Sequence, residues 1–352
     1  SGMSFGALSA RAVESLNAGA RIAGCMQTTG EGGLSPYHLQ GGELVMQFGS
    51  GWFGARDARG RLDLPALVEL VDQHPVRAIE LKLSQGAKPG IGGMLPGSKV
   101  TPEIARIRGV EPWQPCESPP VNPEFHTADQ LLDVVERIAE ATGLPVGIKS
   151  AVGGVGFWDE LATLMETRTR GVDFITIDGG EGGTGSGPLS FVDHVGLPYR
   201  LAQARVLRAF AERGIHHDVV WIGSGRLGLP EESIMAFALG ADMVNAGREA
   251  MISIGCIQAQ RCHTGHCPSG VATQSKWRQR GIDPVLKAER AGAYVVAMRR
   301  EITRLARSTG VGHPSQVSLE HIEVLEGDVL TPVARRFGIE PQWAVPEPEI
   351  SA

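Results

Sequence analysis

The sequence predicts an α/β protein, specifically a (β/α)8 barrel of parallel strands. Seven short apolar segments with strand-like composition are spread over about 250 residues, the usual length of such a barrel. Nearly all of them are followed by a glycine-rich loop and then by a helical pattern. An open doubly wound sheet would show one dominant glycine fingerprint after its first strand. Because glycine clusters follow nearly every strand here, we prefer the barrel.

The chain begins with a turn and a helix rather than with the strand that normally opens a barrel. The chain opens at Ser1 without an initiator Met or a signal-peptide pattern, and residues 4–9 form a glycine-containing turn. Ser9 can cap a helix of small residues that reaches about Ala20. A turn that leads into a helix N-terminus suits an anion or a cofactor. We therefore expect the first barrel strand just upstream of Ser1.

The remaining elements follow from hydrophobic spacing and from glycine and proline breaks. The expected strands are 21–28, 44–48, 79–84, 146–152, 174–177, 219–222 and 243–246. The expected helices are 128–142, 157–170, 199–213, 231–239 and 283–307. About 40 residues after Ser84 are rich in Gly and Pro, which is typical of a lid or binding loop. We divide the chain into a barrel domain, 1–310, and a C-terminal helical extension with a Pro-rich tail, 311–352.

Composition narrows the class of protein. The chain has 352 residues, of which 42% are hydrophobic, enough for a sizeable core. A formal charge of −6 without a basic stripe argues against binding to nucleic acid or an anionic membrane. There is no run of 18 apolar residues, as a membrane span would need. Five cysteines, three of them clustered, do not suggest a disulfide framework, so we expect a cytoplasmic location.

The clustered cysteines predict a metal site. Cys256, Cys262 and Cys267 lie within twelve residues, His263 and His266 lie between them, and a proline follows the last. Three thiolates with a Cys-Pro pair favour an iron–sulfur cluster with one corner that the protein does not anchor. A zinc ion held by three cysteines and one histidine is the alternative, and ordinary buried cysteines are the third possibility.

Charged residues at the ends of the expected strands predict chemistry at one end of the barrel. Lys149 ends a buried strand, where it would either form a structural ion pair or stabilise negative charge on a reduced flavin. Lys82 lies near the end of another expected strand and Lys88 on the loop beyond it, and Glu31 in its glycine setting is the best candidate for proton transfer. Glu31 could equally be a solvated loop residue.

Two glycine loops predict a phosphate site. The segments 223–226 and 247–248 follow the strands that we count as seventh and eighth, where barrels of this kind commonly hold a phosphate. Backbone amides would cradle the phosphate, and Arg226 or Arg248 would add charge-assisted bonds. Tight turns that merely need small residues are the alternative.

Five ordered motifs then make a family resemblance visible. They read SGMSFGALS (1–9), TGEGG (29–33), KLSQGAKPGIGGMLPGSKV (82–100), GGTGSGPLS (182–190) and GCIQAQRCHTGHCPSGVATQ (255–274). Together they resemble the FMN-binding synthase domain of glutamate synthase, in particular the short stand-alone glutamate synthase-like FMN proteins. The resemblance covers residues 1 to about 300.

The resemblance implies a barrel that holds FMN beside a [3Fe-4S] cluster on Cys256, Cys262 and Cys267. Electrons would pass from the cluster to FMN and then as hydride to an imine of a 2-oxo acid and ammonia, so that glutamate or a related amino acid is made. The residues expected at the flavin and its phosphate are Ser4, Gly6, Ala7, Thr28, Lys149, Gly223, Ser224, Gly225, Gly247 and Arg248. Lys82, Gln85, Lys88 and Arg108 match positions that hold 2-oxoglutarate or assist imine reduction, and Glu31 matches the Glu near the ammonia entry.

Departures from the family pattern leave the substrate open. Ile91 and Met94 replace a Glu and a Gln of the 2-oxoglutarate loop, Leu34-Ser35 replaces two acids, and Thr28 stands where an Asn is expected. The pocket should therefore be less polar. An N-methylglutamate synthase-like enzyme, a 2-hydroxy acid oxidase-like flavoenzyme and a non-catalytic electron-transfer subunit are the alternatives.

The resemblance also implies partners. No amidotransferase nucleophile lies within these residues, so ammonia or an amine would come from a partner amidotransferase or from solution. No nicotinamide fingerprint stands in a strand–turn–helix setting, which points to ferredoxin or a reductase subunit as the electron donor. We expect an oligomer.

Overall fold

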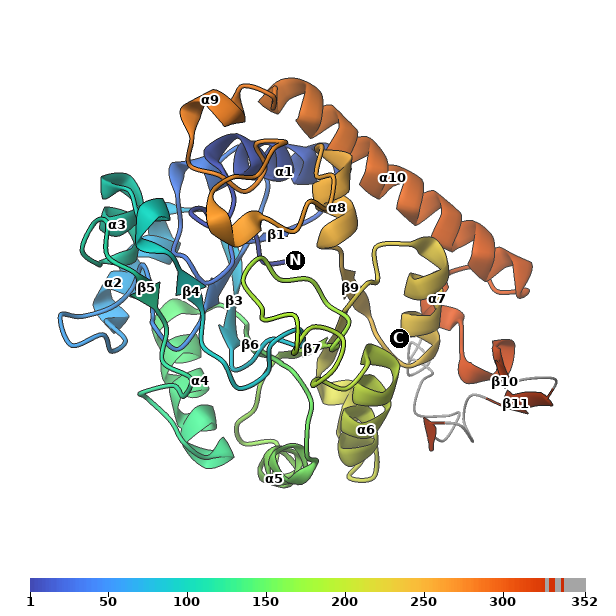
Figure 1. Ribbon diagram of the computed structural model, residues 1–352. Helices are drawn as coiled ribbons and strands as arrows, with labels where there is room; N and C mark the ends of the chain where they lie inside the picture. Colours follow the sequence, from blue (N-terminus) through green and yellow to red (C-terminus); the bar gives the residue numbers. More distant parts are fainter. Residues whose placement is uncertain (327–328, 333–336, 339–352) are drawn as a thin grey trace.

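A parallel sheet of seven strands forms the centre of the computed structural model, which describes residues 1–326, 329–332 and 337–338 (Figure 1). The strand order is β1-β2-β3-β6-β7-β8-β9, and helices lie around the outside of the curled sheet. The strands are β1 (Gln27–Thr28), β2 (Leu44–Phe48), β3 (Val76–Lys82), β6 (Val146–Ser150), β7 (Phe174–Asp178), β8 (Val220–Ser224) and β9 (Met243–Asn245). The predicted barrel-type α/β fold is confirmed.

Ten α-helices are found among the described residues. They are α1 (Ala10–Ala23), α2 (Leu64–Gln73), α3 (Pro102–Arg108), α4 (Ala128–Thr142), α5 (Gly156–Met165), α6 (Tyr199–Ala211), α7 (Pro230–Ala238), α8 (Arg248–Ser253), α9 (Lys276–Gln279) and α10 (Pro284–Ser308). The start of α4 follows the predicted chemistry, because the Thr127 side chain accepts a hydrogen bond from the Gln130 amide. Gly143 ends this helix in the left-handed conformation, with φ 66°.

Several predicted boundaries were wrong. The expected helix 157–170 ends at Met165, and the expected strand 146–152 ends at Ser150. The expected strand 21–28 begins only at Gln27, because Arg21 to Ala23 continue α1 until Gly24 caps it with φ 61°. The expected strand 79–84 runs from Val76 to Lys82 instead, so Ser84 already belongs to the following loop. That loop contains a short antiparallel pair, β4 (Met94–Leu95) with β5 (Cys116–Glu117), together with the 3-10 turn Gly97–Lys99 and α3.

The N-terminal residues lie between the two end strands of the sheet. The Ser1 amine donates to the Ala246 carbonyl at 3.3 Å, just beyond β9. The Met3 amide donates to the Thr28 carbonyl of β1 at 3.1 Å. Residues 1–3 thus bring the first turn of the chain to the carboxyl ends of both strands. The expectation of a strand upstream of Ser1 remains a prediction.

Two large apolar clusters, beside two small ones, build the core of the described part. The larger one joins the sheet to α2, α4, α5 and α6 and includes Leu44, Ile79, Ile148 and Trp221. The second cluster joins the N-terminal turn, the long loop after β3 and the cysteine segment, through Phe5, Leu95, Ile104, Ile254 and Cys267. The expected flavin turn and the cysteine segment therefore share one core.

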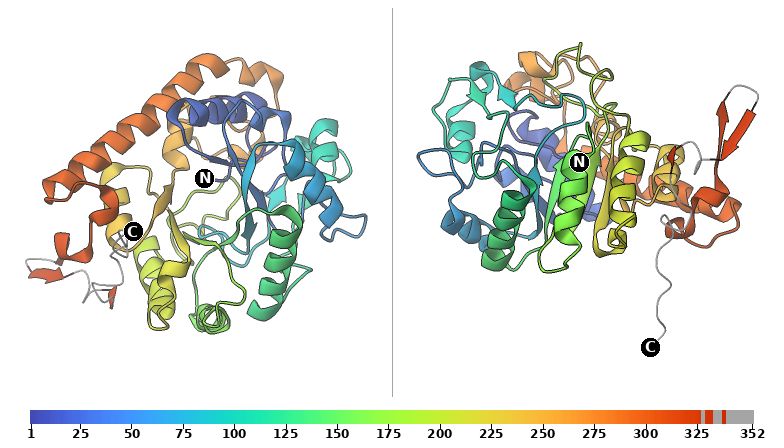
Figure 2. Two further views of the ribbon diagram at one scale, coloured as in Figure 1. Left: turned by 180° about the vertical axis from the view of Figure 1, so that it is seen from behind. Right: turned by 90° about the horizontal axis from the view of Figure 1, so that it is seen from below.

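The C-terminal part differs from the expected helical extension. After α10, which packs along α1, the described residues form the 3-10 turns Pro314–Gln316 and Leu319–His321 and the hairpin β10 (Glu323–Glu326) with β11 (Val329–Pro332). This hairpin projects from the side of the barrel (Figure 2). The Pro-rich tail lies outside the described residues, and the domain division at 310 remains a prediction. No helix of the described part is long and apolar enough to cross a bilayer.

Candidate active site

Four predicted residues line one cavity at the carboxyl ends of the strands. They are Glu31, Lys82, Gln85 and Lys88. The Lys82 Nζ lies 3.3 Å from the Glu31 Oε1 and donates to the Gln85 Oε1 at 3.0 Å. The cavity measures about 30 Å³, which is room for one or two water-sized molecules. The structure thus brings these residues together, although their contacts with a substrate remain a prediction.

Lys88 is the cavity lysine that has no carboxylate within ion-pair distance among the described residues. It is 4% exposed, and its Nζ donates to the Gly92 carbonyl at 3.3 Å and to the Ser186 Oγ at 3.2 Å. Ser186 comes from the motif 182–190, so the loop after β7 contacts Lys88. Both acceptors are neutral, which leaves the positive charge of Lys88 available to an anion.

The charges in the cavity shift each other's ionisation. Burial opposes ionisation of Glu31, but the ammonium groups of Lys82 and Lys88 and the guanidinium of Arg108 outweigh it and lower the pKa of the carboxyl. Burial also lowers the pKa of Lys88, and the neighbouring charge of Lys82 acts in the same direction. Glu31 is therefore a carboxylate at neutral pH, and Lys88 gives up its proton more readily than an ordinary lysine.

A second charged group lies on β6, β7 and β8. The Nζ of Lys149 is 3.4 Å from the Asp178 Oδ1 and 3.4 Å from the Ser224 Oγ, and Ser224 donates to Asp178 at 2.6 Å. Asp178 also accepts the Gly86 amide at 2.8 Å, which ties the loop after β3 to β7. Burial would lower the pKa of Lys149, but Asp178 and Glu80 outweigh it and raise the pKa.

Sequence reasoning missed Asp178 and Glu80. Glu80 is 2% exposed on β3 and accepts hydrogen bonds from Gln47 and, at 2.6 Å, from Thr176. A signal was present, because Glu80 alternates with Lys82 and so shares its strand face. Asp178 ends β7 just before a glycine run, which is where barrel enzymes carry functional groups.

The two predicted phosphate loops lie side by side. Ser224 of β8 pairs with Asn245 of β9, so the Gly223–Gly225 and Gly247–Arg248 loops begin at the same level. Gly225 has φ 131°, which a side chain would rarely adopt. Arg226 is held by Asp193 at 2.8 Å, whereas Arg248 makes no hydrogen bond or ion pair with the described residues. The arginine free to meet an anion is therefore Arg248.

Three side chains donate hydrogen bonds to carbonyl groups of the expected flavin turn, residues 4–8. Arg108 donates to the Phe5 carbonyl at 3.3 Å, and Gln274 donates to the Gly6 and Leu8 carbonyls at 3.0 Å. Lys99 donates to the Ala7 carbonyl at 2.8 Å. Among the predicted substrate residues Arg108 is thus an exception, because it supports this turn and does not line the cavity.

Arg108 has further contacts behind the turn. Its guanidinium lies over the Phe53 ring, 5.4 Å from the centroid, and one nitrogen donates to the Cys116 sulfur at 3.7 Å. The two residues that replace polar residues of the family's 2-oxoglutarate loop lie in different places. Ile91 lines the cavity, whereas Met94 is 54% exposed and does not. Thr28 is buried on β1.

The three clustered cysteines are free thiols that contact the second apolar cluster. Burial raises the pKa of Cys262, and the neighbouring thiols of Cys256 and Cys267 act in the same direction. Burial opposes ionisation of Cys267, but hydrogen bonds from Ser269 and from backbone amides outweigh it and lower the pKa. In the described part of the chain, no group of three or more His, Cys, Asp or Glu side chains has metal-binding geometry.

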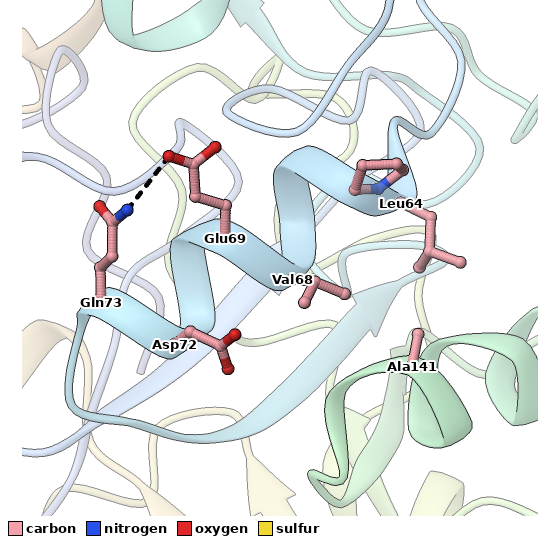
Figure 3. Close-up of a pocket in the computed structure, with 7 residues that line it drawn as sticks. Leu64, Val68, Glu69, Asp72, Gln73 and Ala141 are labelled. Carbon is pink, nitrogen blue, oxygen red and sulfur yellow. Dashed lines mark hydrogen bonds between the residues drawn. The ribbon is translucent and has the colours of Figure 1, made fainter.

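A larger hollow lies elsewhere, on the outside of the barrel between α2 and α4 (Figure 3). Its volume is about 580 Å³, and it is lined by Leu64, Pro65, Val68, Glu69, Asp72, Gln73 and Ala141. Gln73 and Glu69 hydrogen-bond to each other at 3.1 Å, and no predicted site residue takes part. This hollow is an open apolar surface between two helices, so the candidate site is the cavity at the strand ends.

Comparison with known proteins identifies relatives of this chain. It is 40% identical over 324 residues to the glutamate synthase large subunit-like protein YerD of Bacillus subtilis, covering 92% of this chain and 62% of that protein. It is 35% identical over 312 residues to the archaeal glutamate synthase [NADPH] of Methanocaldococcus jannaschii, covering 88% and 58%. The chain thus spans about 60% of the length of these relatives.

The fold has solved counterparts as well. The recombinant flavin-binding domain of flavocytochrome b2 from baker's yeast superposes with a TM-score of 0.51 at 14% identity, covering 90% of this chain and 68% of that one. At this identity the likeness concerns the fold alone. A sequence model described as the conserved region in glutamate synthase matches residues 1–312. The chain therefore belongs to the glutamate synthase family, as its five motifs predict.

Proposed function

We propose that the chain is an FMN- and iron–sulfur-dependent oxidoreductase of the glutamate synthase type, which reduces an imine formed from a 2-oxo acid and ammonia or another amine. The observation that carries the proposal is the convergence of Glu31, Lys82, Gln85 and Lys88 in one cavity at the strand ends. Membership of the family supplies the reaction class.

The residues present fit a flavin phosphate. Arg248 has no partner among the described residues, and one of its nitrogens lies 3.9 Å from where a Cβ on Gly183 would stand. The loops that begin at Gly223 and Gly247 lie next to each other, and they present backbone amides without side-chain bulk. We assign these two loops and Arg248 to the phosphate.

The residues around the barrel centre fit the flavin ring. Lys149 holds a buried positive charge between Asp178 and Ser224, and Ser4, Gly6 and Ala7 belong to the turn fixed from behind. When bound there, FMN supplies hydride for the reduction. Lys149 would stabilise negative charge on the ring, and Asp178 would keep Lys149 oriented.

The cavity residues then have distinct roles. Lys88, whose charge has no carboxylate partner in the described part, binds the substrate carboxylate or donates a proton at the imine nitrogen. Lys82 and Gln85 orient the 2-oxo acid, and Glu31, an ionised carboxylate beside Lys82, receives the ammonium or amine. Ile91 gives one wall of the cavity an apolar character.

The cysteine segment fits a cluster in its chemistry. Cys267 receives backbone hydrogen bonds of the kind that stabilise a sulfur anion, and Lys99 brings a buried cation beside Cys262. We propose that Cys256, Cys262 and Cys267 hold a [3Fe-4S] cluster that relays electrons from outside. The electron donor would be ferredoxin or a reductase subunit, and the relative named for NADPH supports a reductase.

The test begins with anaerobic purification, followed by absorption, metal analysis and EPR of the oxidised protein. Bound flavin and about three irons per chain support the proposal, whereas zinc, or no metal and no flavin, refutes it. A screen with ammonia and methylamine against several 2-oxo acids then identifies the substrate. Oxidation of a 2-hydroxy acid without any amination would favour the oxidase alternative.

A further inference from the structure

The charged side chains that line the cavity at the strand ends leave one positive charge without a counter-charge. Among the described residues these side chains are Glu31, Lys82 and Lys88, two lysines and one carboxylate. The Lys82 Nζ lies 3.3 Å from the Glu31 Oε1, so this pair is neutral as a whole. Lys88 is buried and donates to the Gly92 carbonyl and the Ser186 hydroxyl, which are both uncharged. The cavity can therefore neutralise one substrate carboxylate.

Lys82 is already occupied and cannot serve a second carboxylate. Backbone on both sides fixes Glu31, since a Cβ on Gly93 would lie 2.6 Å from one carboxylate oxygen and a Cβ on Gly49 would clash with the other. The Gln85 amide is engaged as well, because its oxygen accepts from Lys82 and its nitrogen donates to a carbonyl of the loop after β7, both at 3.0 Å. A second carboxylate beside this group would meet the negative charge of Glu31.

The other side chains around the cavity offer no further cation in the described part of the chain. Arg108 does not line the cavity, and it donates to the Phe5 carbonyl at 3.3 Å instead. Four of the lining residues are apolar, namely Leu83, Ile91, Pro119 and Pro120. A carboxylate placed against them would lose water without gaining a partner, which is strongly unfavourable. The volume of about 30 Å³ also favours a short side chain.

We propose that the substrate of this site is a 2-oxo acid with a single carboxylate and a short apolar side chain, in preference to a 2-oxo dicarboxylic acid. Lys88 binds the one carboxylate, and the apolar lining residues contact the side chain. This inference rests on the proposed function, because it names the class of 2-oxo acid from which the proposed imine is formed.

Three acids separate the effect of charge from that of size. 2-Oxopentanoate has the carbon chain of 2-oxoglutarate but lacks its distal carboxylate. The ester of 2-oxoglutarate methylated at the distal carboxylate is larger than the parent acid, yet it also lacks the second charge. Calorimetric titration of the purified protein without an amine measures their binding. Both monocarboxylic acids should bind about 10-fold or more tightly than 2-oxoglutarate, and kcat/KM for amination should follow the same order.

A pair of lysine substitutions tests the charge balance from the side of the protein. Ile91 lines the cavity and is 41% exposed, whereas Met94 lies in the same loop, is 54% exposed and does not line it. Ile91→Lys adds a second cation at the cavity and should shift the preference toward 2-oxoglutarate by about 10-fold or more. Met94→Lys adds the same charge away from the cavity and should keep the wild-type preference. Thermal unfolding confirms that both variants are folded.

The outcomes separate this inference from the proposed function. If wild type aminates none of the acids yet binds the monocarboxylic ones more tightly, the proposed function fails and the cavity still selects a single carboxylate. If wild type aminates 2-oxoglutarate with a kcat/KM equal to or above that for 2-oxopentanoate, the substrate class is refuted while the reaction type stands. Binding of none of the acids, or equal shifts of preference in Ile91→Lys and Met94→Lys, would also refute the substrate class, because the charge of the cavity would then not select the acid.

Discussion

Replacement of Asp178 by Asn tests how the buried charges at the strand ends are balanced. Asp178 is 4% exposed and Lys149 is 6% exposed, with their charged atoms 3.4 Å apart. Asn keeps the shape and can still accept a hydrogen bond from Ser224 or Gly86, so the main change is an uncompensated ammonium. Breaking a buried pair on one side costs about 3–5 kcal/mol. Because Glu80 still acts on Lys149, we expect the lower end, about 3 kcal/mol.

The expected shift follows from the size of the chain. With about 2.1 cal/mol/K of unfolding entropy per residue, 352 residues give about 0.7 kcal/mol/K, so 3 kcal/mol lowers the melting temperature by about 4 °C. Circular dichroism during heating measures this shift on the protein without cofactors. Asp242→Asn is the control, since Asp242 accepts the Trp221 amide at 2.8 Å and has no Lys or Arg within ion-pair distance in the described part. It should change the melting temperature by about 1 °C or less.

A double variant tests the reasoning directly. Asp178→Asn combined with Lys149→Met removes both charges of the pair, while hydrogen bonds from Gln47 and Thr176 still stabilise the Glu80 carboxylate. The double variant should therefore be more stable than Asp178→Asn alone. If Asp178→Asn melts within about 1 °C of wild type, or if the double variant is less stable than Asp178→Asn, the balance of charges is not what stabilises this end of the barrel.

Three further predictions concern the cavity and its loops. Lys88→Ala should keep flavin, yet its amination rate in steady-state assays should fall by about 100-fold or more. In wild type the same rate should decline as pH rises through the pKa of Lys88, which lies below that of an ordinary lysine. Folding lowers the pKa of Glu31, so its carboxylate stabilises the folded protein fully above the unfolded pKa and loses this effect as pH falls through the folded pKa. Wild type should therefore lose melting temperature below about pH 4, and Glu31→Gln should lose less. Gly86→Ala would place a Cβ 2.0 Å from the Gly179 carbonyl and should destabilise by about 1–3 kcal/mol, whereas Gly154→Ala, which meets nothing within 4 Å, should not, as urea unfolding will report.

The fold was largely predictable because hydrophobic spacing and capping residues are local signals. Strand 44–48 and helix 128–142 match the structure, and Thr127 and Gly143 mark the helix ends as expected. The error at 21–28 arose because an apolar helical end resembles a strand. Gly24 was the overlooked signal, since it caps α1 in the left-handed conformation.

The cavity was predictable in part. Lys82, Gln85 and Lys88 lie close together in sequence, so their convergence followed from one loop. Asp178 was missed because its partner Gly86 lies 92 residues away, and no local pattern shows that contact. Lys99 was missed for the same reason, since 163 residues separate it from Cys262. Interactions fixed by the packing of distant loops need the structure.

The buried cations of the described residues point to where negatively charged partners bind. Lys88, Lys99, Arg108 and Lys149 are all at most 6% exposed, yet Lys149 alone among them has a carboxylate within ion-pair distance. Arg108 lies over the Phe53 ring and still acts on the charge of Glu31. That leaves Lys88 facing the cavity and Lys99 beside the cysteines.

An uncompensated buried cation is costly in a free protein and becomes favourable when an anion arrives. A 2-oxo acid should therefore raise the melting temperature of wild type but not of Lys88→Ala, whereas Lys99→Met should keep this response to the acid. If the acid stabilises all three proteins equally, it binds away from Lys88, and the cavity at the strand ends is not the substrate site.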